Sequence, residues 1–278
     1  MGGSLARALR RAGAVGEIVG CARNTADLGT AVELGVIDRW TTDPAEAVAG
    51  ADVVMVAVTL GATEQILAKA APALEPDAVV TDVGSTKGSV VAAARRVLGP
   101  AIARFVGGHP IAGSERTGVE ASFADLYVNH RVILTPLPEN DLQAVAKVRA
   151  MWESCGAIVT EMDVAHHDEV LAATSHLPHM LAYALVDALV GMSTSGEIFD
   201  YAAGGFRDTT RIAASSPEMW RDIALANAPA VLAMCDRFEA TFGAVRAAIA
   251  AGDGEALRTI FARAKAARER LPLRGPSR

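Results

Sequence analysis

Residues 51–59 read Ala-Asp-Val-Val-Met-Val-Ala-Val-Thr, and residues 78–83 read Ala-Val-Val-Thr-Asp-Val. Each run is short, apolar and rich in valine, which favours a buried β-strand. Between the two runs, Ala62–Ala71 places apolar side chains at helical spacing. A strand, a helix and a second strand form the unit of a mostly parallel sheet. These residues therefore predict an α/β fold.

The same alternation continues on both sides of this unit. The predicted strands are Glu17–Cys21, Ala51–Thr59, Ala78–Val83, Arg104–Gly107, Arg131–Thr135 and Ala157–Met162, and the predicted helices between them are Ser4–Ala12, Thr25–Leu34, Ala62–Ala71 and Lys87–Val97. Beyond Asp163 no strand-like run follows, and helical spacing recurs over Asp168–Val190, Pro217–Phe242 and Gly254–Arg270, with Ser215 as the expected cap of the helix at Pro217. We predict a Rossmann-type nucleotide-binding domain over residues 1–163, an all-helical substrate and dimerisation domain over 164–271, and a disordered tail over 272–278.

Composition excludes several classes of protein. The 278 residues carry a formal net charge of −6, which argues against a nucleic-acid surface. Apolar stretches such as Val53–Val58 are shorter than the roughly 18–20 residues that span a bilayer. Cys21, Cys155 and Cys235 lie far apart and form no CxxC pair, and the N-terminus does not resemble a signal peptide. We therefore expect a reducing, cytoplasmic compartment.

The N-terminus points to a dinucleotide cofactor. Such folds open with a strand, a G-x-G-x-x-G turn and a helix whose N-terminal amides hold the pyrophosphate. Gly2 fits the third glycine of this motif, with Gly3 and Ser4 in the first helical turn, so the chain is expected to begin inside the motif without its first strand. The alternative is a flexible glycine start that has no chemical role.

The residues that would face the cofactor ribose are Ala22 and Arg23, at the end of the strand about 20 residues on. An acid at this position would accept hydrogen bonds from both ribose hydroxyls, whereas an arginine would pair with the 2′-phosphate of NADP. An arginine in a solvated loop is the alternative. We predict NADP acceptance without excluding NAD, and we place Val58 and Thr59, at the end of the next strand, in the same site.

Five polar segments are not explained by packing. They are residues 82–88 (DVGSTKG), 107–118 (GGHPIAGSERTG), 175–179 (SHLPH), 204–213 (GGFRDTTRIA) and 219–222 (MWRD). In order and spacing they resemble the prephenate/arogenate dehydrogenase family, and the cyclohexadienyl dehydrogenases in particular. The resemblance runs over nearly the whole chain. It implies an NAD(P)-dependent oxidative decarboxylation of prephenate or arogenate in tyrosine biosynthesis, and a homodimer formed through the helical domain.

The resemblance also implies two catalytic residues. His109 would accept the proton of the substrate hydroxyl, for which an unperturbed pKa near 6.5 is suitable. Ser85 would hold both that hydroxyl and the nicotinamide edge. The alternatives are a histidine that is hydrogen-bonded in a Gly/Pro turn and a serine that caps the helix beginning near Lys87.

Substrate-binding residues follow from the same resemblance. Arg211 would bind a substrate carboxylate through its planar fork, while Arg207 is expected to be a salt-bridge residue. The remaining expected pocket residues are His176, His179, Ser114 and Glu115. Glu115 could distinguish the amino group of arogenate from the keto group of prephenate, although a solvated carboxylate is the alternative.

Four of the six histidines lie between His166 and His179, which invites a metal interpretation. Neither an HExxH pattern nor a nearby cysteine supports it, so we predict no metal. His166 and His167 are expected to be exposed at the domain boundary.

Two other functional interpretations are alternatives to a prephenate/arogenate dehydrogenase. A β-hydroxyacid dehydrogenase would require a catalytic lysine in the helical domain, and residues 163–264 contain no lysine. A noncatalytic dinucleotide-binding or dimerisation module is the second alternative.

Overall fold

The protein is represented by a computed structural model that describes residues 1–113, 117–192 and 195–270. The chain divides into two compact units, Met1–Asn227 and Ala228–Arg278. The first unit holds both sheets and the helices up to α11, and the second is a pair of helices. An α/β region followed by helices is the predicted fold class, and the comparisons below confirm it.

A five-stranded sheet with the strand order β3-β4-β5-β6-β7 forms the centre of the first unit. Its strands are β3 (Val53–Val56), β4 (Val79–Asp82), β5 (Phe105–Pro110), β6 (Arg131–Thr135) and β7 (Ile158–Glu161). Neighbours pair in parallel except β5 and β6, which are antiparallel. The sheet is thus mostly parallel, as predicted.

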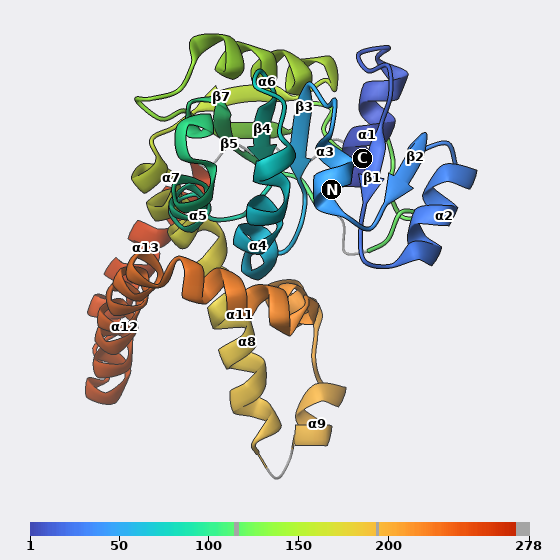
Figure 1. The fold of residues 1–278 in the computed structure, drawn as a ribbon. Coiled ribbons are helices and arrows are strands. Elements are labelled where there is room, and N and C mark those ends of the chain that lie inside the picture. Colours follow the sequence, from blue (N-terminus) through green and yellow to red (C-terminus); the bar gives the residue numbers. More distant parts are fainter. Residues whose placement is uncertain (114–116, 193–194, 271–278) are drawn as a thin grey trace. The chain divides into compact units, whose positions relative to one another are not determined.

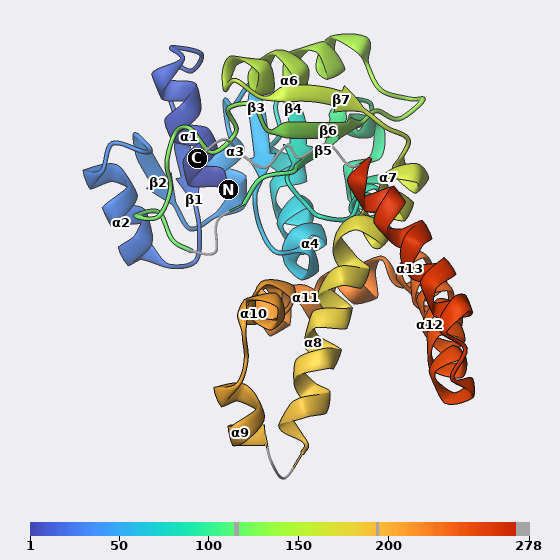
Figure 2. The same cartoon turned by 180° about the vertical axis from the view of Figure 1, so that it is seen from behind.

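A separate two-stranded parallel sheet is formed by β1 (Val19–Cys21) and β2 (Arg39–Thr41). Figures 1 and 2 show it with α2 (Thr25–Glu33) to one side of the five-stranded sheet, next to α1 (Gly2–Arg11). β2 was not predicted from the sequence, because Arg-Trp-Thr is too short to show an apolar alternation.

Helices cover both faces of the five-stranded sheet. On one face, α1 and α6 (Leu142–Ser154) pack against Val79 and Val106. On the other face, α4 (Leu60–Ala70) and α5 (Gly88–Leu98) pack against Val80 and Phe105. Successive residues of a strand point to opposite faces, so each strand contributes to both clusters. This two-sided burial explains why the strands have continuous apolar runs.

Helices follow the last strand. Within the first unit they are α7 (Val164–Leu171), a π-helical turn (Ala172–His176), α8 (Leu177–Val190), α9 (Ser195–Asp200), α10 (Gly204–Thr210), a 3-10 turn (Arg211–Ala214) and α11 (Pro217–Ala226). Among the described residues, a short α3 (Pro44–Val48), α6, α9 and α10 are helices that were not predicted from the sequence. The predicted cap at Ser215 is wrong by one residue. The Ser216 hydroxyl accepts from the Met219 amide and caps α11.

The second unit consists of α12 (Ala228–Ala251) and α13 (Gly254–Glu269). The Asp253 side chain accepts from the Ala256 amide and so caps α13. Phe238 and Phe242 stack with ring centroids 5.8 Å apart, and both rings remain exposed. Across the described part of the chain, the helices are all too short or too polar to cross a membrane.

Candidate active site

A buried ion pair joins the ends of two neighbouring strands. The Lys87 Nζ lies 2.5 Å from Asp82 Oδ2 and donates to the Gly108 carbonyl at 2.6 Å. The Gly108 amide in turn donates to Asp82 Oδ1 at 3.0 Å. Both charged side chains are almost fully buried, so each requires the other as a partner. The pair therefore fixes the β5 backbone beside His109 to the end of β4.

His109 lies within β5, opposite Ile133 of β6. The predicted strand Arg104–Gly107 was too short, and the alternative of a turn histidine is wrong, because pairing with antiparallel β6 carries β5 to Pro110. The histidine is 9% exposed. Burial, and then the positive charge of Lys87, lower the pKa of His109 well below its usual 6.5. The imidazole is therefore neutral at pH 7.

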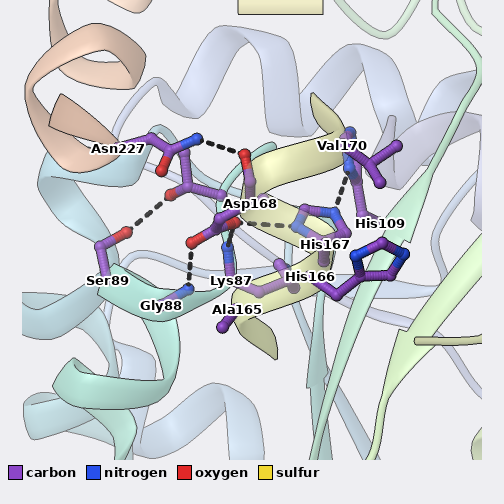
Figure 3. Close-up of polar contacts among 12 residues, drawn as sticks. Lys87, Gly88, Ser89, His109, Ala165, His166, His167, Asp168, Val170 and Asn227 are labelled. Carbon is purple, nitrogen blue, oxygen red and sulfur yellow. Dashed lines mark hydrogen bonds and ion pairs between the residues drawn. The ribbon is translucent and has the colours of Figure 1, made fainter. Parts of the chain in front are cut away.

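A line of hydrogen bonds leads from His109 to the start of α5 (Figure 3). His109 Nδ1 lies 2.9 Å from His167 Nε2, and His167 Nδ1 lies 2.8 Å from Asp168 Oδ1. The Asp168 carboxylate also accepts from the backbone amides of Lys87 and Gly88, both at 2.8 Å. The two contacts of Asp168 with the start of α5 join residues about eighty positions apart in the sequence.

The exposed position predicted for His167 is wrong. Asp163 caps α7 by accepting from the amides of Ala165 and His166, which sets the rotation of the helix. His167 then faces inward and is completely buried, whereas His166 is exposed as predicted. No role was predicted for Asp168 from the sequence, although an acid directly after a histidine was a signal for it.

The same carboxylate caps α5. The predicted alternative, a cap by Ser85, is not observed: the Lys87 N-cap position makes no cap bond of its own, and the negative charge of Asp168 sits at the positive helix end. Burial opposes ionisation of Asp168, but hydrogen bonds from His167 and from the two amides outweigh it, and they lower its pKa. Ser85 itself is half-buried in the loop between β4 and α5.

His176 lies at the end of the π-helical turn and is 1% exposed. The Asn227 side-chain amide donates to the Asp168 carbonyl at 2.8 Å and lies 3.1 Å from His176 Nδ1. Burial lowers the pKa of His176 to about 4, and the backbone of Ser85 faces the ring. His176 Nε2 has no hydrogen-bond partner among the described residues. Such an orphaned buried atom is suited to meet a ligand.

A second cluster surrounds Trp220. The His179 ring stacks on the indole with centroids 3.5 Å apart, and its Nδ1 lies 2.8 Å from the Ser175 carbonyl. Burial, and also the charge of Arg211, lower the pKa of His179, so Arg211 lies close to this ring. Arg211 is exposed in the 3-10 turn after α10.

Arg207 lies one turn earlier, on α10, and is exposed. The predicted salt bridge is not present, because Arg207 forms no ion pair with any residue in the described ranges.

The predicted cofactor residues lie at the ends of β1 and β3 and at the start of α1. A Cβ at Gly2 would lie 3.2 Å from Cβ of Ala57, so the first turn of α1 closely approaches the loop after β3. In that loop Val58 and Thr59 are exposed, as are Ala22 and Arg23 after β1. These positions are open to a ligand.

Ser4 differs from this group. It is buried, and its hydroxyl accepts from the Phe123 amide at 3.2 Å. A role in α1 packing therefore accounts for this side chain, while its backbone remains in the first helical turn.

Ser114 and Glu115 lie outside the described residues. Within the described ranges, no group of three or more potential metal ligands gathers.

Comparison with known proteins gives one consistent result. Residues 5–161 match the family described as "Prephenate dehydrogenase, nucleotide-binding domain", and residues 163–263 match "Prephenate dehydrogenase, dimerization domain". The chain is 42% identical to the cyclohexadienyl dehydrogenase of Zymomonas mobilis over 87% of this chain and 82% of that protein. It is 38% identical to the prephenate dehydrogenase of Bacillus subtilis over 99% of this chain and 74% of that protein.

A solved structure agrees with these relatives. The prephenate dehydrogenase of A. aeolicus, in complex with hydroxyphenyl propionate and NAD+, superimposes with a TM-score of 0.89 at 40% identity, covering 96% of this chain and 93% of that one. Similarity of this extent includes both the nucleotide-binding and the helical parts. The chain therefore belongs to the prephenate dehydrogenase family.

Proposed function

We propose that the chain oxidises and decarboxylates prephenate, with His109 as the base for the substrate hydroxyl. The activity is the prephenate/cyclohexadienyl dehydrogenase activity of its relatives, an oxidoreductase step in tyrosine biosynthesis. The observation that carries the assignment of His109 is a neutral, buried imidazole held by a further histidine at the end of the central sheet. In open α/β sheets, this edge is where ligands bind.

The chemistry requires a base that both accepts and returns one proton. When hydride leaves the carbinol carbon, the hydroxyl proton passes to Nε2 of His109 and a dienone forms. The bond to the ring carboxylate then breaks, carbon dioxide leaves, and its electron pair aromatises the ring as a phenolate. The phenolate oxygen takes the proton back from His109, so no net proton is released. A base that is neutral at pH 7 suits this cycle.

Ser85 and His176 complete the site around the hydroxyl. Ser85 follows β4 in a loop whose backbone faces the His176 ring, and we assign its hydroxyl to the substrate hydroxyl and the nicotinamide edge. We also assign the unpartnered Nε2 of His176 to the substrate. His176 interacts electrostatically with both His109 and His179, so it connects the two ends of the site.

We assign the carboxylate end of the site to Arg211 and His179. The Arg211 charge acts on His179, which the Trp220 ring holds in place by stacking. A guanidinium binds a carboxylate through two parallel hydrogen bonds. Ser114 and Glu115 remain proposed residues of the pocket mouth.

The described residues fit a dinucleotide. The close approach at Gly2 leaves little room for a side chain beside the loop after β3, and the residues that follow β1 and β3 are exposed. Gly2, Gly3 and the Ser4 backbone would hold the pyrophosphate, Ala22 and Arg23 the adenosine ribose, and Val58 and Thr59 the opposite wall. The bound nucleotide supplies a hydride acceptor. NAD+ is present in the A. aeolicus relative, and for this chain we propose that NADP+ is also accepted.

The cofactor proposal rests on the absence of an acid at Ala22. We expect Ala22→Asp to shift the ratio of kcat/KM with NAD+ to that with NADP+ toward NAD+ by at least about tenfold, since like charges placed together cost more than the roughly 1.4 kcal/mol that tenfold represents. Ala22→Asn has the same size without the charge and is the control. Equal ratios in both variants and the wild type would show that residue 22 does not face the ribose.

The proposed activity is tested by steady-state kinetics of the purified chain with prephenate and arogenate, each with NAD+ and NADP+. We expect reduced nicotinamide to form together with carbon dioxide and 4-hydroxyphenylpyruvate when prephenate and NAD+ are supplied. Absence of turnover in all four combinations would overturn the proposal.

We also propose a homodimer formed through the helical region, which includes the segment that matches a dimerisation domain. The exposed Phe238 and Phe242 rings on α12 are apolar surface of the kind buried in such contacts. We expect Phe242→Glu to give a monomer in sedimentation velocity experiments, whereas Leu142→Glu, at a still more exposed apolar position on α6, should leave the dimer intact. A dimeric Phe242→Glu would place the interface elsewhere.

A further inference from the structure

The donor and the acceptor can be assigned in each hydrogen bond that links His109, His167 and Asp168. Asp168 is ionised, since it accepts from two backbone amides, so the hydrogen on His167 Nδ1 is donated to Oδ1. In a neutral His167 the other nitrogen, Nε2, is then unprotonated and accepts. The shared contact of 2.9 Å therefore requires that His109 donates from Nδ1.

We propose that Asp168 and His167 are positioning residues that hold His109 in the Nδ1–H tautomer, and so leave its Nε2 unprotonated as the base. This inference rests on the proposed role of His109. The opposite arrangement needs a hydrogen on both ring nitrogens of His167, which would place an additional charge in a completely buried ring. It would also leave a hydrogen on His109 Nε2, where the substrate proton must go.

The same contacts stabilise His109 after it has accepted the proton. The Nδ1–H of the imidazolium donates more strongly to His167, and the ionised Asp168 partly neutralises the charge through the intervening ring. Asp168 cannot turn away, because its second oxygen accepts from Gly88 and the Asn227 side chain binds its carbonyl. The capping of α5 and the orientation of the base therefore depend on one carboxylate.

The other charged or titratable groups near His109 act alongside these residues. Among the described residues they are Lys87 and Asp82, from the β4–α5 region, and His176, from the π-helical turn. Lys87 and Asp82 bond to each other, and His176 bonds to Asn227, so His167 is the partner that contacts the His109 ring.

The first test is the tautomer itself, read from the ring-nitrogen resonances of the whole protein with 15N-labelled histidine and assigned by comparison with His109→Asn. At pH 7.5 we expect a protonated Nδ1 and an unprotonated Nε2 for His109. In His167→Leu the acceptor is lost, and we expect the Nε2–H form to appear. A wild-type His109 protonated on Nε2 would overturn the inference, whatever the kinetics show.

The second test is the pH profile with prephenate and NAD+. We expect His167→Leu to lower kcat by about 10- to 100-fold, less than the 10²–10⁴ typical of losing a base, with KM nearly unchanged. Loss of the acceptor destabilises the His109 imidazolium, so its pKa falls and the acid limb of kcat/KM moves to lower pH. A profile and kcat equal to those of the wild type would contradict the inference.

Two further variants separate positioning from folding. His167→Gln fills similar space, and its amide oxygen can accept from His109 Nδ1, so we expect the Nδ1–H tautomer and most of kcat to be recovered. Failure of this rescue in a variant with wild-type thermal stability would contradict the inference. His166→Gln, at the exposed neighbour, is the control that should leave tautomer, profile and kcat unchanged. If the tautomer is as expected but His109→Asn retains activity, the proposed function fails rather than the tautomer assignment.

Discussion

We expect His109→Asn to lower kcat by about 10²- to 10⁴-fold, which is the range that general acid–base catalysis contributes. Asparagine keeps a hydrogen-bonding side chain of similar reach but cannot accept a proton near neutrality. Because the hydroxyl contact is retained in part, KM for prephenate should change little. Steady-state kinetics at pH 7.5 measure both effects.

The wild-type profile belongs to the same prediction. Burial lowers the pKa of His109, so the neutral base persists below pH 6.5 and kcat/KM should begin to fall only at a more acidic pH. In His109→Asn this limb should disappear. His130→Asn, at a half-buried histidine bonded to the Val128 carbonyl, is the matched control and should retain kcat. Near-normal turnover by His109→Asn would remove this residue from the mechanism.

The second large effect is expected in binding. Arg211→Ala should raise KM for prephenate by roughly 30-fold to several thousand-fold, because a carboxylate that loses a charge-assisted bidentate partner loses on the order of 2 to 5 kcal/mol. The affinity for NAD+ should stay nearly the same, since Arg211 follows α10 and lies outside the predicted nucleotide-binding residues. Steady-state KM values and fluorescence titration with NADH test the two statements separately.

Arg207→Ala is the matched control for Arg211. Arg207 is exposed on α10, one turn away, and its charge has no counterpart among the described acidic residues. An exposed charge of this kind contributes about 0 to 1 kcal/mol, so KM should change by a few-fold at most. If Arg207→Ala binds prephenate more weakly than Arg211→Ala, the carboxylate site is centred on α10 and not on the turn after it.

Local sequence pattern was sufficient for the fold class. The valine-rich runs at Val53–Val56 and Val79–Asp82 are neighbouring strands that pair in parallel. Continuous apolar runs of this kind are typical of strands that are covered on both faces of a parallel sheet. Segments that lack this periodicity were missed. β2 is three residues long, and α6 has charged residues between the apolar ones, although Ala144, Val148 and Trp152 form its buried face.

The sequence by itself also determined the candidates for chemistry, since His109, Ser85, His179 and Arg211 stand in motifs that resemble one family. The tertiary structure alone decided how these residues are held. Asp168 lies 81 positions from Lys87, and His167 lies 58 from His109, yet each pair is joined by a hydrogen bond. Periodicity reports only which face of an element is apolar. Whether a polar residue is buried depends on which distant element packs over it. His167 and Asp168 are buried because α7 packs on the start of α5.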